Sequence, residues 1–238
     1  MKRTLYALPL LLMFTSAAHA EQPAVQKVPG TDLEEKAFQL TIEDRAQPSR
    51  DPRKVLQDIQ GLNRYLGSYP PNLKTEEERE QVYKRWLDLA ADTEAFAKNS
   101  PVREMSLYMQ SELYRQGHNL DVRGSADRAN TALTNCLQDF PESTPCHLSA
   151  SYFYLAIGPQ YLDDAEKSLA FLRSHYAPKH HPEVEGGYVF LHIYRQDAEA
   201  AKQQIDFFLK TFPETHPRAQ MFKEIRKGLE GGIDVNRQ

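Results

Sequence analysis

The chain has 238 residues and a formal net charge of -4 at pH 7, and 26% of its residues are charged. A mildly acidic balance of this kind creates no overall field that would attract nucleic acid or an anionic membrane, so neither is expected as a partner. Eleven glycines are few for this length, and no alternation typical of strands persists, so we expect an all-α protein.

The first 20 residues are typical of a secretory signal peptide. The chain starts with Met-Lys-Arg, an apolar run follows over residues 5–14, and Ala-His-Ala at 18–20 supplies small residues before a cleavage site. The run is shorter than the roughly 20 apolar residues of a transmembrane helix. We expect cleavage after Ala20 and a mature protein in the periplasm or outside the cell, with no membrane insertion. A retained membrane anchor is the alternative.

Residues 21–50 are predicted to be a flexible leader. They contain Pro23, Pro29 and Pro48, scattered charges and no sustained apolar period. A short helix over residues 33–40 is the only regular element expected there.

Residues 51–101 are predicted to form two N-terminal helices. The first has Asp51 as its N-cap and Pro52 at its first position, and it stops at Gly67. The second starts near Thr75, where a capping box with Glu78 is expected, and ends before residue 99. Both helices carry apolar residues at three- and four-residue spacing, which is typical of an amphipathic helix.

Residues 102–232 are predicted to form three helix pairs and a last helix. The pairs are 102–117 with 124–138, 147–157 with 162–176, and 183–195 with 198–211, and the last helix is 217–229. On one side the last helix has the apolar residues Met221, Phe222, Ile225 and Leu229. A helix with one apolar side is suited to covering the end of a stack of repeats.

The second helices of these pairs repeat one another at a spacing of 36 residues. A small residue recurs at Ala129, Ala165 and Ala201, an aliphatic residue follows four positions later, an aromatic one eleven positions later, and then a proline. These later positions are Leu133, Leu169 and Ile205; Phe140, Tyr176 and Phe212; and Pro141, Pro178 and Pro213. A fixed period of this length indicates a stack of helix pairs.

These residues resemble the tetratricopeptide repeat family, in which small and aromatic positions pack between paired helices and a proline closes each pair. In the first helices the small positions would be Ser111, Ser151 and Gly187, and the aromatic positions Tyr114, Tyr154 and Phe190. The resemblance implies a right-handed α-solenoid of antiparallel helix pairs, with degenerate N-terminal helices and a C-terminal capping helix. Because the period is 36 and not 34, a related helical repeat is the alternative.

The resemblance also implies a function, because the first helices of such repeats line a concave face that binds a protein or peptide. We therefore expect a non-enzymatic scaffold or adaptor in the cell envelope that needs no cofactor. The candidate contact residues are Tyr108, Glu112, Arg115, Tyr152, Leu155, Tyr188, Leu191 and His192. Tyr152 and Tyr188 are 36 residues apart, so we expect them on one wall of the groove as interaction hot spots. The alternative is that these tyrosines are ordinary core residues.

Cys136 and Cys146 are the only cysteines and lie ten residues apart. In an exported chain we expect them to form a disulfide between the end of one helix and the start of the next. Two buried free thiols are the alternative.

No metal site or catalytic motif is predicted. The densest set of potential metal ligands is His175, His180, His181, Glu183 and Glu185, which lacks the spacing of a zinc motif. No nucleophile elbow, phosphate-binding loop or dinucleotide fingerprint occurs. The alternative function is a cell-envelope hydrolase that acts on cell-wall material through a carboxylate or histidine site. A self-assembling structural element is a third possibility, since the sequence leaves the oligomeric state open.

Overall fold

The computed structural model describes residues 47–99 and 102–231. Within these ranges every regular element is helical, so the expected all-α class is confirmed. The predicted signal peptide over residues 1–20 and the predicted helix over residues 33–40 lie outside the described residues. No helix within the described ranges is long and apolar enough to cross a membrane.

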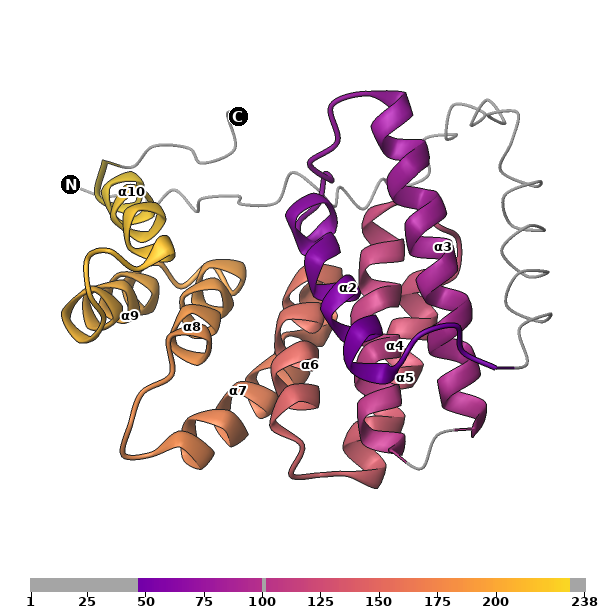
Figure 1. Cartoon of the computed structure of the whole chain (residues 1–238). Helices are drawn as coiled ribbons and strands as arrows, with labels where there is room; N and C mark the ends of the chain where they lie inside the picture. The colour runs from indigo at the N-terminus through magenta and orange to yellow at the C-terminus, as the bar shows by residue number, and fades with distance from the viewer. Residues whose placement is uncertain (1–46, 100–101, 232–238) are drawn as a thin grey trace, which may run out of the picture. The chain divides into compact units, whose positions relative to one another are not determined.

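The helices fall into two compact units, with the division inside α6 at residues 149 and 150. The first unit contains α2 (Pro52–Leu66), α3 (Glu76–Asn99), α4 (Arg103–Asn119), α5 (Ser125–Asp139) and the start of α6 (Thr144–Ile157). The second unit contains the rest of α6, the 3-10 turn η1 (Pro159–Tyr161), α7 (Leu162–Tyr176), α8 (Pro182–Tyr194), α9 (Ala198–Thr211) and α10 (Pro217–Gly231). In the first unit α4 packs against α2, α3 and α5, and in the second α8 packs against α7 and α9 (Figure 1).

The helix starts follow from local capping chemistry. The Asp51 carboxylate accepts hydrogen bonds from the backbone N–H groups of Arg53 and Lys54, at 3.0 and 3.1 Å. At α3 the Thr75 hydroxyl accepts from the Glu78 N–H at 3.1 Å, and the Glu78 carboxylate accepts from the N–H of Lys74 at 2.7 Å. The Thr75 half of the predicted capping box is therefore present, whereas the Glu78 side chain accepts from the residue before the N-cap and not from Thr75 itself.

The predicted helix ends agree with the structure to within a few residues, and the largest difference is at α6. This helix begins at Thr144, not at residue 147. The Ser143 hydroxyl accepts a hydrogen bond from the N–H of Cys146 at 3.3 Å, as an N-cap does, and Pro145 is tolerated in the first turn. Because Ser143 caps the helix and Pro145 fits its first turn, the helix begins three residues before the predicted start.

Trp86 is at the centre of the core of the first unit. Its indole N–H donates to the Leu113 carbonyl at 2.7 Å, and its ring meets the Tyr114 ring edge-on at 6.4 Å. Gly117 on α4 lies directly against it: a Cβ atom there would be 2.5 Å from the Trp86 ring and 2.6 Å from the Ser125 hydroxyl. A residue without a side chain is therefore needed where α3, α4 and α5 meet.

This contact predicts that Gly117→Ala is destabilising, although alanine is a better helix former by about 1 kcal/mol. We expect a loss of about 1–3 kcal/mol, because the buried indole has no room to move. Urea unfolding followed by Trp86 fluorescence measures it. Gly61→Ala is the matched control: Gly61 is an exposed residue inside α2, and a Cβ added there would meet no other side chain within 4 Å, so that change should be neutral or stabilising. Equal effects of the two changes would contradict the packing argument.

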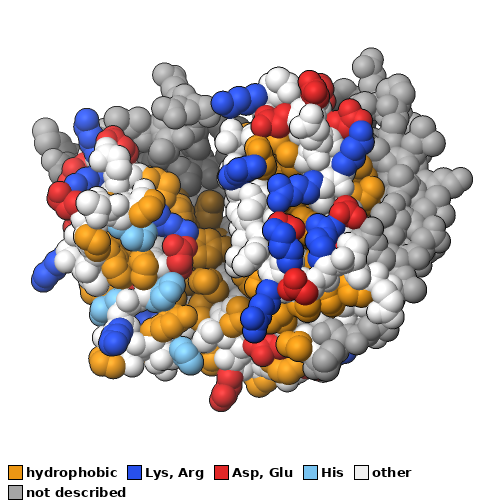
Figure 2. Space-filling model, in the orientation of Figure 1, with side chains coloured by type: hydrophobic (Ala, Val, Ile, Leu, Met, Phe, Trp, Pro, Cys, Tyr) orange, Lys and Arg blue, Asp and Glu red, His pale blue; other side chains and the backbone are white. Residues whose placement is uncertain are grey.

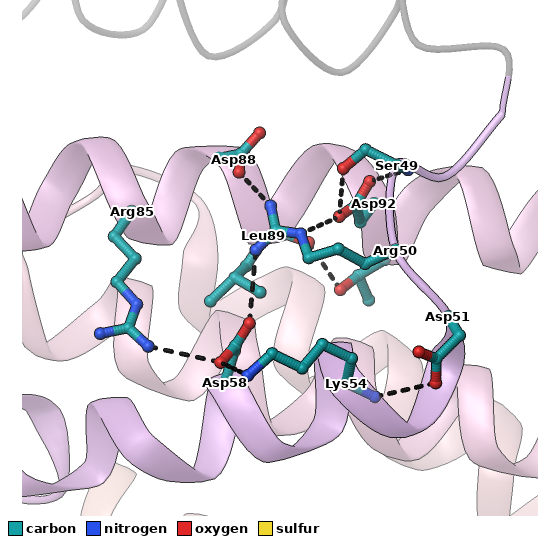
Figure 3. A network of polar contacts seen from close by, with 10 residues as sticks. Ser49, Arg50, Asp51, Lys54, Asp58, Arg85, Asp88, Leu89 and Asp92 are labelled. Carbon is teal, nitrogen blue, oxygen red and sulfur yellow. Dashed lines mark hydrogen bonds and ion pairs between the residues drawn. The ribbon is translucent and has the colours of Figure 1, made fainter.

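An ion-pair network ties the segment before α2 to α3. Asp92 on α3 has no exposed surface, and it pairs with Arg50 at 2.8 Å. It also accepts hydrogen bonds from the backbone N–H and the hydroxyl of Ser49, at 2.6 and 2.9 Å. Figure 3 shows Arg50 extended between this carboxylate and those of Asp58 and Asp88. A buried charge is tolerated when it is paired and hydrogen-bonded in this way.

The core of the second unit is formed by Val189, Ile205, Phe208 and Phe222, so α8, α9 and α10 share one cluster. Ile225 and Leu229 on α10 pack against this cluster. The prediction for Met221 was wrong, because its side chain is 39% exposed. Met221 is adjacent to the buried Phe222 in sequence, and the 100° turn between successive helical residues carries it out of the contact.

Among the repeated positions, the small and the aliphatic ones are core positions, whereas the aromatic residues are partly buried and the prolines are exposed. Ala129, Ala165 and Ala201 and the aliphatic residues four positions later all have no exposed surface. At the small position of α8, a Cβ added to Gly187 would be 2.6 Å from a methyl carbon of Leu169. Small residues at these sites allow close approach of helices, and the aliphatic residues fill the space beside them.

The predicted disulfide is confirmed: the Cys136 and Cys146 sulfur atoms are 2.03 Å apart. Both cysteines are fully buried beside Leu107, and the partly buried Phe140 packs against them. The bond joins the last turn of α5 to the first turn of α6.

Candidate functional site

The candidate residues on α4 lie on one face of the helix, but this face is not open. Arg115 donates to the Asn63 side chain on α2 at 2.8 Å and to Glu112 at 3.0 Å. Glu112 also accepts from the Ser149 hydroxyl on α6 at 2.6 Å. Burial, together with the nearby charge of Glu112, raises the pKa of Tyr108 to about 12. Arg115 therefore connects α4 to α2, and Glu112 connects α4 to α6.

Tyr152 in the second unit is held in a similar way. Its hydroxyl donates to the Glu183 carbonyl at 2.6 Å and accepts from Arg218, whose guanidinium lies 5.0 Å from the ring. Arg218 also pairs with the Glu183 carboxylate at 2.5 Å. Burial raises the pKa of Tyr152, so the hydroxyl stays protonated and remains a donor. The set joins α6, α8 and α10.

Three of the predicted groove residues are buried. Leu155 is 5% exposed and Leu191 is not exposed, so both belong to the core and do not line an open groove. Tyr188 is 7% exposed and lies under Arg173, whose guanidinium is 3.6 Å from its ring. His192 is partly buried, which lowers its pKa. The prediction treated each first helix as free on one side, whereas neighbouring helices cover much of that side.

The structure does bring part of the histidine and glutamate set together. Glu185 is 1% exposed and lies 3.2 Å from the His180 ring nitrogen, but it also pairs with Arg173 at 2.5 Å and accepts from Gln204 at 2.9 Å. The His181 ring stacks on Tyr176 at 4.6 Å. In Figure 2 histidines of this unit lie among hydrophobic side chains. In the described part of the chain no three potential ligands are close enough to hold a metal ion.

A hollow of about 300 Å³ lies between α3, α4 and α5, and we call it the α3–α5 hollow. Its lining residues are Glu94, Gln110, Tyr114, Asp127, Arg128, Thr131, Ala132 and Asn135. The Tyr114 hydroxyl donates to the Glu94 carboxylate, which also accepts from the Gln110 amide at 3.2 Å. Arg128 lies over the Tyr114 ring at 5.5 Å and reaches its hydroxyl at 3.4 Å. Burial, and next the charge of Glu94, raises the pKa of Tyr114, which therefore stays a hydrogen-bond donor.

Two polar side chains of this hollow have unused hydrogen-bonding groups. The Asn135 amide and the Asp127 carboxylate have no side-chain partner among the described residues. An amide offers two donor hydrogens and an acceptor oxygen, whereas a carboxylate offers acceptors only. The hollow therefore offers both donor and acceptor groups.

A second hollow, of about 390 Å³, lies beside the disulfide, and we call it the disulfide hollow. It is lined by Glu104, Asp139, Phe140, Pro141, Glu142 and Ser143. Phe140 also packs on the buried cystine, so the aromatic wall is attached to the disulfide. Asp139 pairs with Arg103 at 2.7 Å.

Sequence reasoning missed both hollows. Gln110, Arg128 and Asn135 lie outside the repeated positions, and Tyr114 was interpreted as a packing residue only. A hollow forms where side chains of three helices stop short of one another, and no spacing along the chain reports that. No family model, curated protein or solved structure matches this chain.

Proposed function

We propose that this chain is an exported, non-enzymatic adaptor of the cell envelope that binds a polypeptide segment of a partner protein in the α3–α5 hollow. The observation that carries the proposal is the Asn135 amide, which has no side-chain partner among the described residues and lines the hollow together with Gln110 and Asp127. An extended polypeptide presents alternating C=O and N–H groups, and an amide side chain can pair with both. Sites on helices also hold their side chains more precisely than sites on loops.

We also propose that the helices form a tetratricopeptide-like solenoid. Support comes from contacts between successive first helices. Gln116 on α4 donates to the Ile59 carbonyl of α2 at 2.7 Å, and the Ser111 and Ser149 hydroxyls of α4 and α6 are 3.2 Å apart. The Tyr152 contact joins α6 to α8, and the rings of Phe190 on α8 and Phe222 on α10 are 5.7 Å apart. Nearest-neighbour stacking of this kind is the defining property of a solenoid.

Export is part of the proposal. It rests on the basic start, apolar run and small residues of the first 20 positions. A disulfide persists in the periplasm and outside the cell and is rare in the cytosol, so the Cys136–Cys146 bond agrees with that address.

A non-catalytic role is part of the proposal. Arg173 on α7 and Gln204 on α9 both donate to Oε2 of the buried Glu185 carboxylate on α8, and the other oxygen, Oε1, lies 3.2 Å from the His180 ring nitrogen. Such a tie between three helices accounts for the burial of Glu185 without a catalytic role.

The proposal predicts site-specific crosslinking. A photoreactive amino acid at Thr131, an exposed residue of the hollow, should give an adduct with an envelope protein when the full chain is expressed with its signal. Adding Asn135→Ala should reduce the adduct about tenfold, because one or two hydrogen bonds of about 1 kcal/mol each are lost. Mass spectrometry of the adduct identifies the partner.

Thr134 supplies the matched control, since it is an exposed threonine of the same helix that does not line the hollow. The same reagent at Thr134 should give no adduct. Equal adducts at both positions, or an adduct at Thr131 that is unchanged by Asn135→Ala in a folded protein, would contradict the site.

A further inference from the structure

We infer that the bound segment is extended and basic, with an arginine or lysine side chain in the disulfide hollow. This inference rests on the proposed function and adds the chemistry of the partner. The two hollows share α4 and α5, and together they are lined by five carboxylates and one arginine. Complementary charge is what selects a partner and orients it at such a surface.

One face of α5 runs through both hollows. Asp127, Thr131, Asn135 and Asp139 follow one another at four-residue spacing; the first three line the α3–α5 hollow and the last lines the disulfide hollow. Successive residues at this spacing are about 40° apart around a helix, so the four form a stripe that winds through about 120° over a length of about 18 Å. An extended chain covers that length with about five or six residues. A single short segment can therefore contact both hollows.

The five carboxylates differ in how many hydrogen bonds and ion pairs they make within the described part of the chain. Glu94 accepts from Tyr114 and Gln110. Among the described residues Asp139 pairs only with Arg103, at an exposed position, and such surface pairs contribute little. Asp127, Glu104 and Glu142 have no ion-pair or side-chain hydrogen-bond partner among the described residues. Two of these three lie in the disulfide hollow.

The disulfide hollow also has an apolar side. Phe140 and Pro141 line it together with Glu104 and Glu142. Arginine and lysine bury their methylene stems on apolar surface and keep the charged end in polar surroundings. A guanidinium also matches two carboxylate oxygens at once. A hollow with an apolar wall and free carboxylates therefore suits a basic side chain better than an acidic or a purely apolar one.

The test compares three labelled peptides of about six residues that differ only at their two ends, with arginine, glutamine or glutamate there and alanine and serine between. Fluorescence anisotropy with the mature, oxidised chain should show binding of the arginine peptide that weakens as salt is added. The double variant Glu104→Gln/Glu142→Gln should weaken this binding about tenfold. The double variant Glu76→Gln/Glu77→Gln should not, although it changes the net charge equally, because these exposed residues lie at the opposite end of α3 from Glu94.

The outcomes separate the two proposals. Binding of the glutamine peptide as tight as that of the arginine peptide, lost in Asn135→Ala but not in Glu104→Gln/Glu142→Gln, would overturn the basic partner and leave the peptide site standing. Tighter binding of the glutamate peptide would overturn it as well. If no peptide binds and Thr131 gives no adduct in the envelope, the proposed function itself is wrong.

Discussion

Trp86→Ala should lower the free energy of unfolding by about 3–5 kcal/mol, the range for removing a large aromatic residue from a core. Trp86 has no exposed surface, and three helices depend on it. Its indole N–H satisfies the Leu113 carbonyl, its ring packs on Tyr114, and Gly117 leaves room for it. The change leaves a cavity that these helices can close only partly, and it removes a buried hydrogen bond.

Circular dichroism during urea unfolding is the suitable measurement, because the variant has no tryptophan left to follow. Tyr69→Ala serves as the control for loss of an aromatic residue, since Tyr69 is 58% exposed in the loop between α2 and α3. It should change the stability by less than about 0.5 kcal/mol. A cost for Trp86→Ala no larger than that of Tyr69→Ala would show that the three helices do not depend on the indole.

Removal of the disulfide has the second large effect. The double variant Cys136→Ala/Cys146→Ala should be less stable by about 3 kcal/mol in the chain-entropy model for a loop of this length. The bond limits the unfolded chain, and it also holds the end of α5 and the start of α6 against Phe140. We therefore expect the disulfide hollow to lose its shape together with the bond.

Two urea curves for each protein test this. The wild-type chain, unfolded and refolded in the presence of a thiol reductant, should become about as unstable as the double variant. The double variant should give the same curve with and without reductant. If reduction leaves the wild-type curve unchanged while free thiols are detected, the bond has no part in stability.

The two predictions concern residues that support the two hollows of the proposed site, Trp86 for the α3–α5 hollow and the disulfide for the disulfide hollow. Trp86 packs on Tyr114, which lines the α3–α5 hollow, and Phe140 connects the cystine to the disulfide hollow. A conservative change that keeps the fold but shifts either contact should therefore alter peptide binding more than an equally destabilising change in the second unit. Both contacts, Trp86 with Tyr114 and Phe140 with the cystine, therefore help to position the face of α5 that lies between the two hollows.

Much of the helical arrangement was predictable because it follows from local rules. The caps at Asp51 and Thr75, the stop at Gly67 and the three- and four-residue apolar spacing act over one or two turns of chain. The repeated alanines were also predictable as structural residues, and all three have no exposed surface. The disulfide followed from the two cysteines together with the expectation that the chain is exported.

The site was far less predictable. Arg115 was expected to face a ligand, and it bonds to Asn63, which lies 52 positions earlier in the chain. Tyr188 was expected on a groove wall and lies under Arg173. In both cases a helix or side chain from elsewhere in the chain occupies the surface, and helix periodicity tells only which side a residue is on, not what covers it.

The sequence alone was enough to predict that this protein is built of helices, where nearly all of them begin and end, which residues repeat, and that its two cysteines pair. Those properties depend on neighbours within a few turns and on a period of 36 residues. The packing of the helices was needed to show that Gly117 must accommodate Trp86 and that Arg50 is held by three aspartates. It was also needed to show that Asn135, in the hollow between α3, α4 and α5, has no side-chain partner within the part of the chain that the structure describes. Each of these depends on side chains far apart in the chain, whose distances are set by how the helices pack.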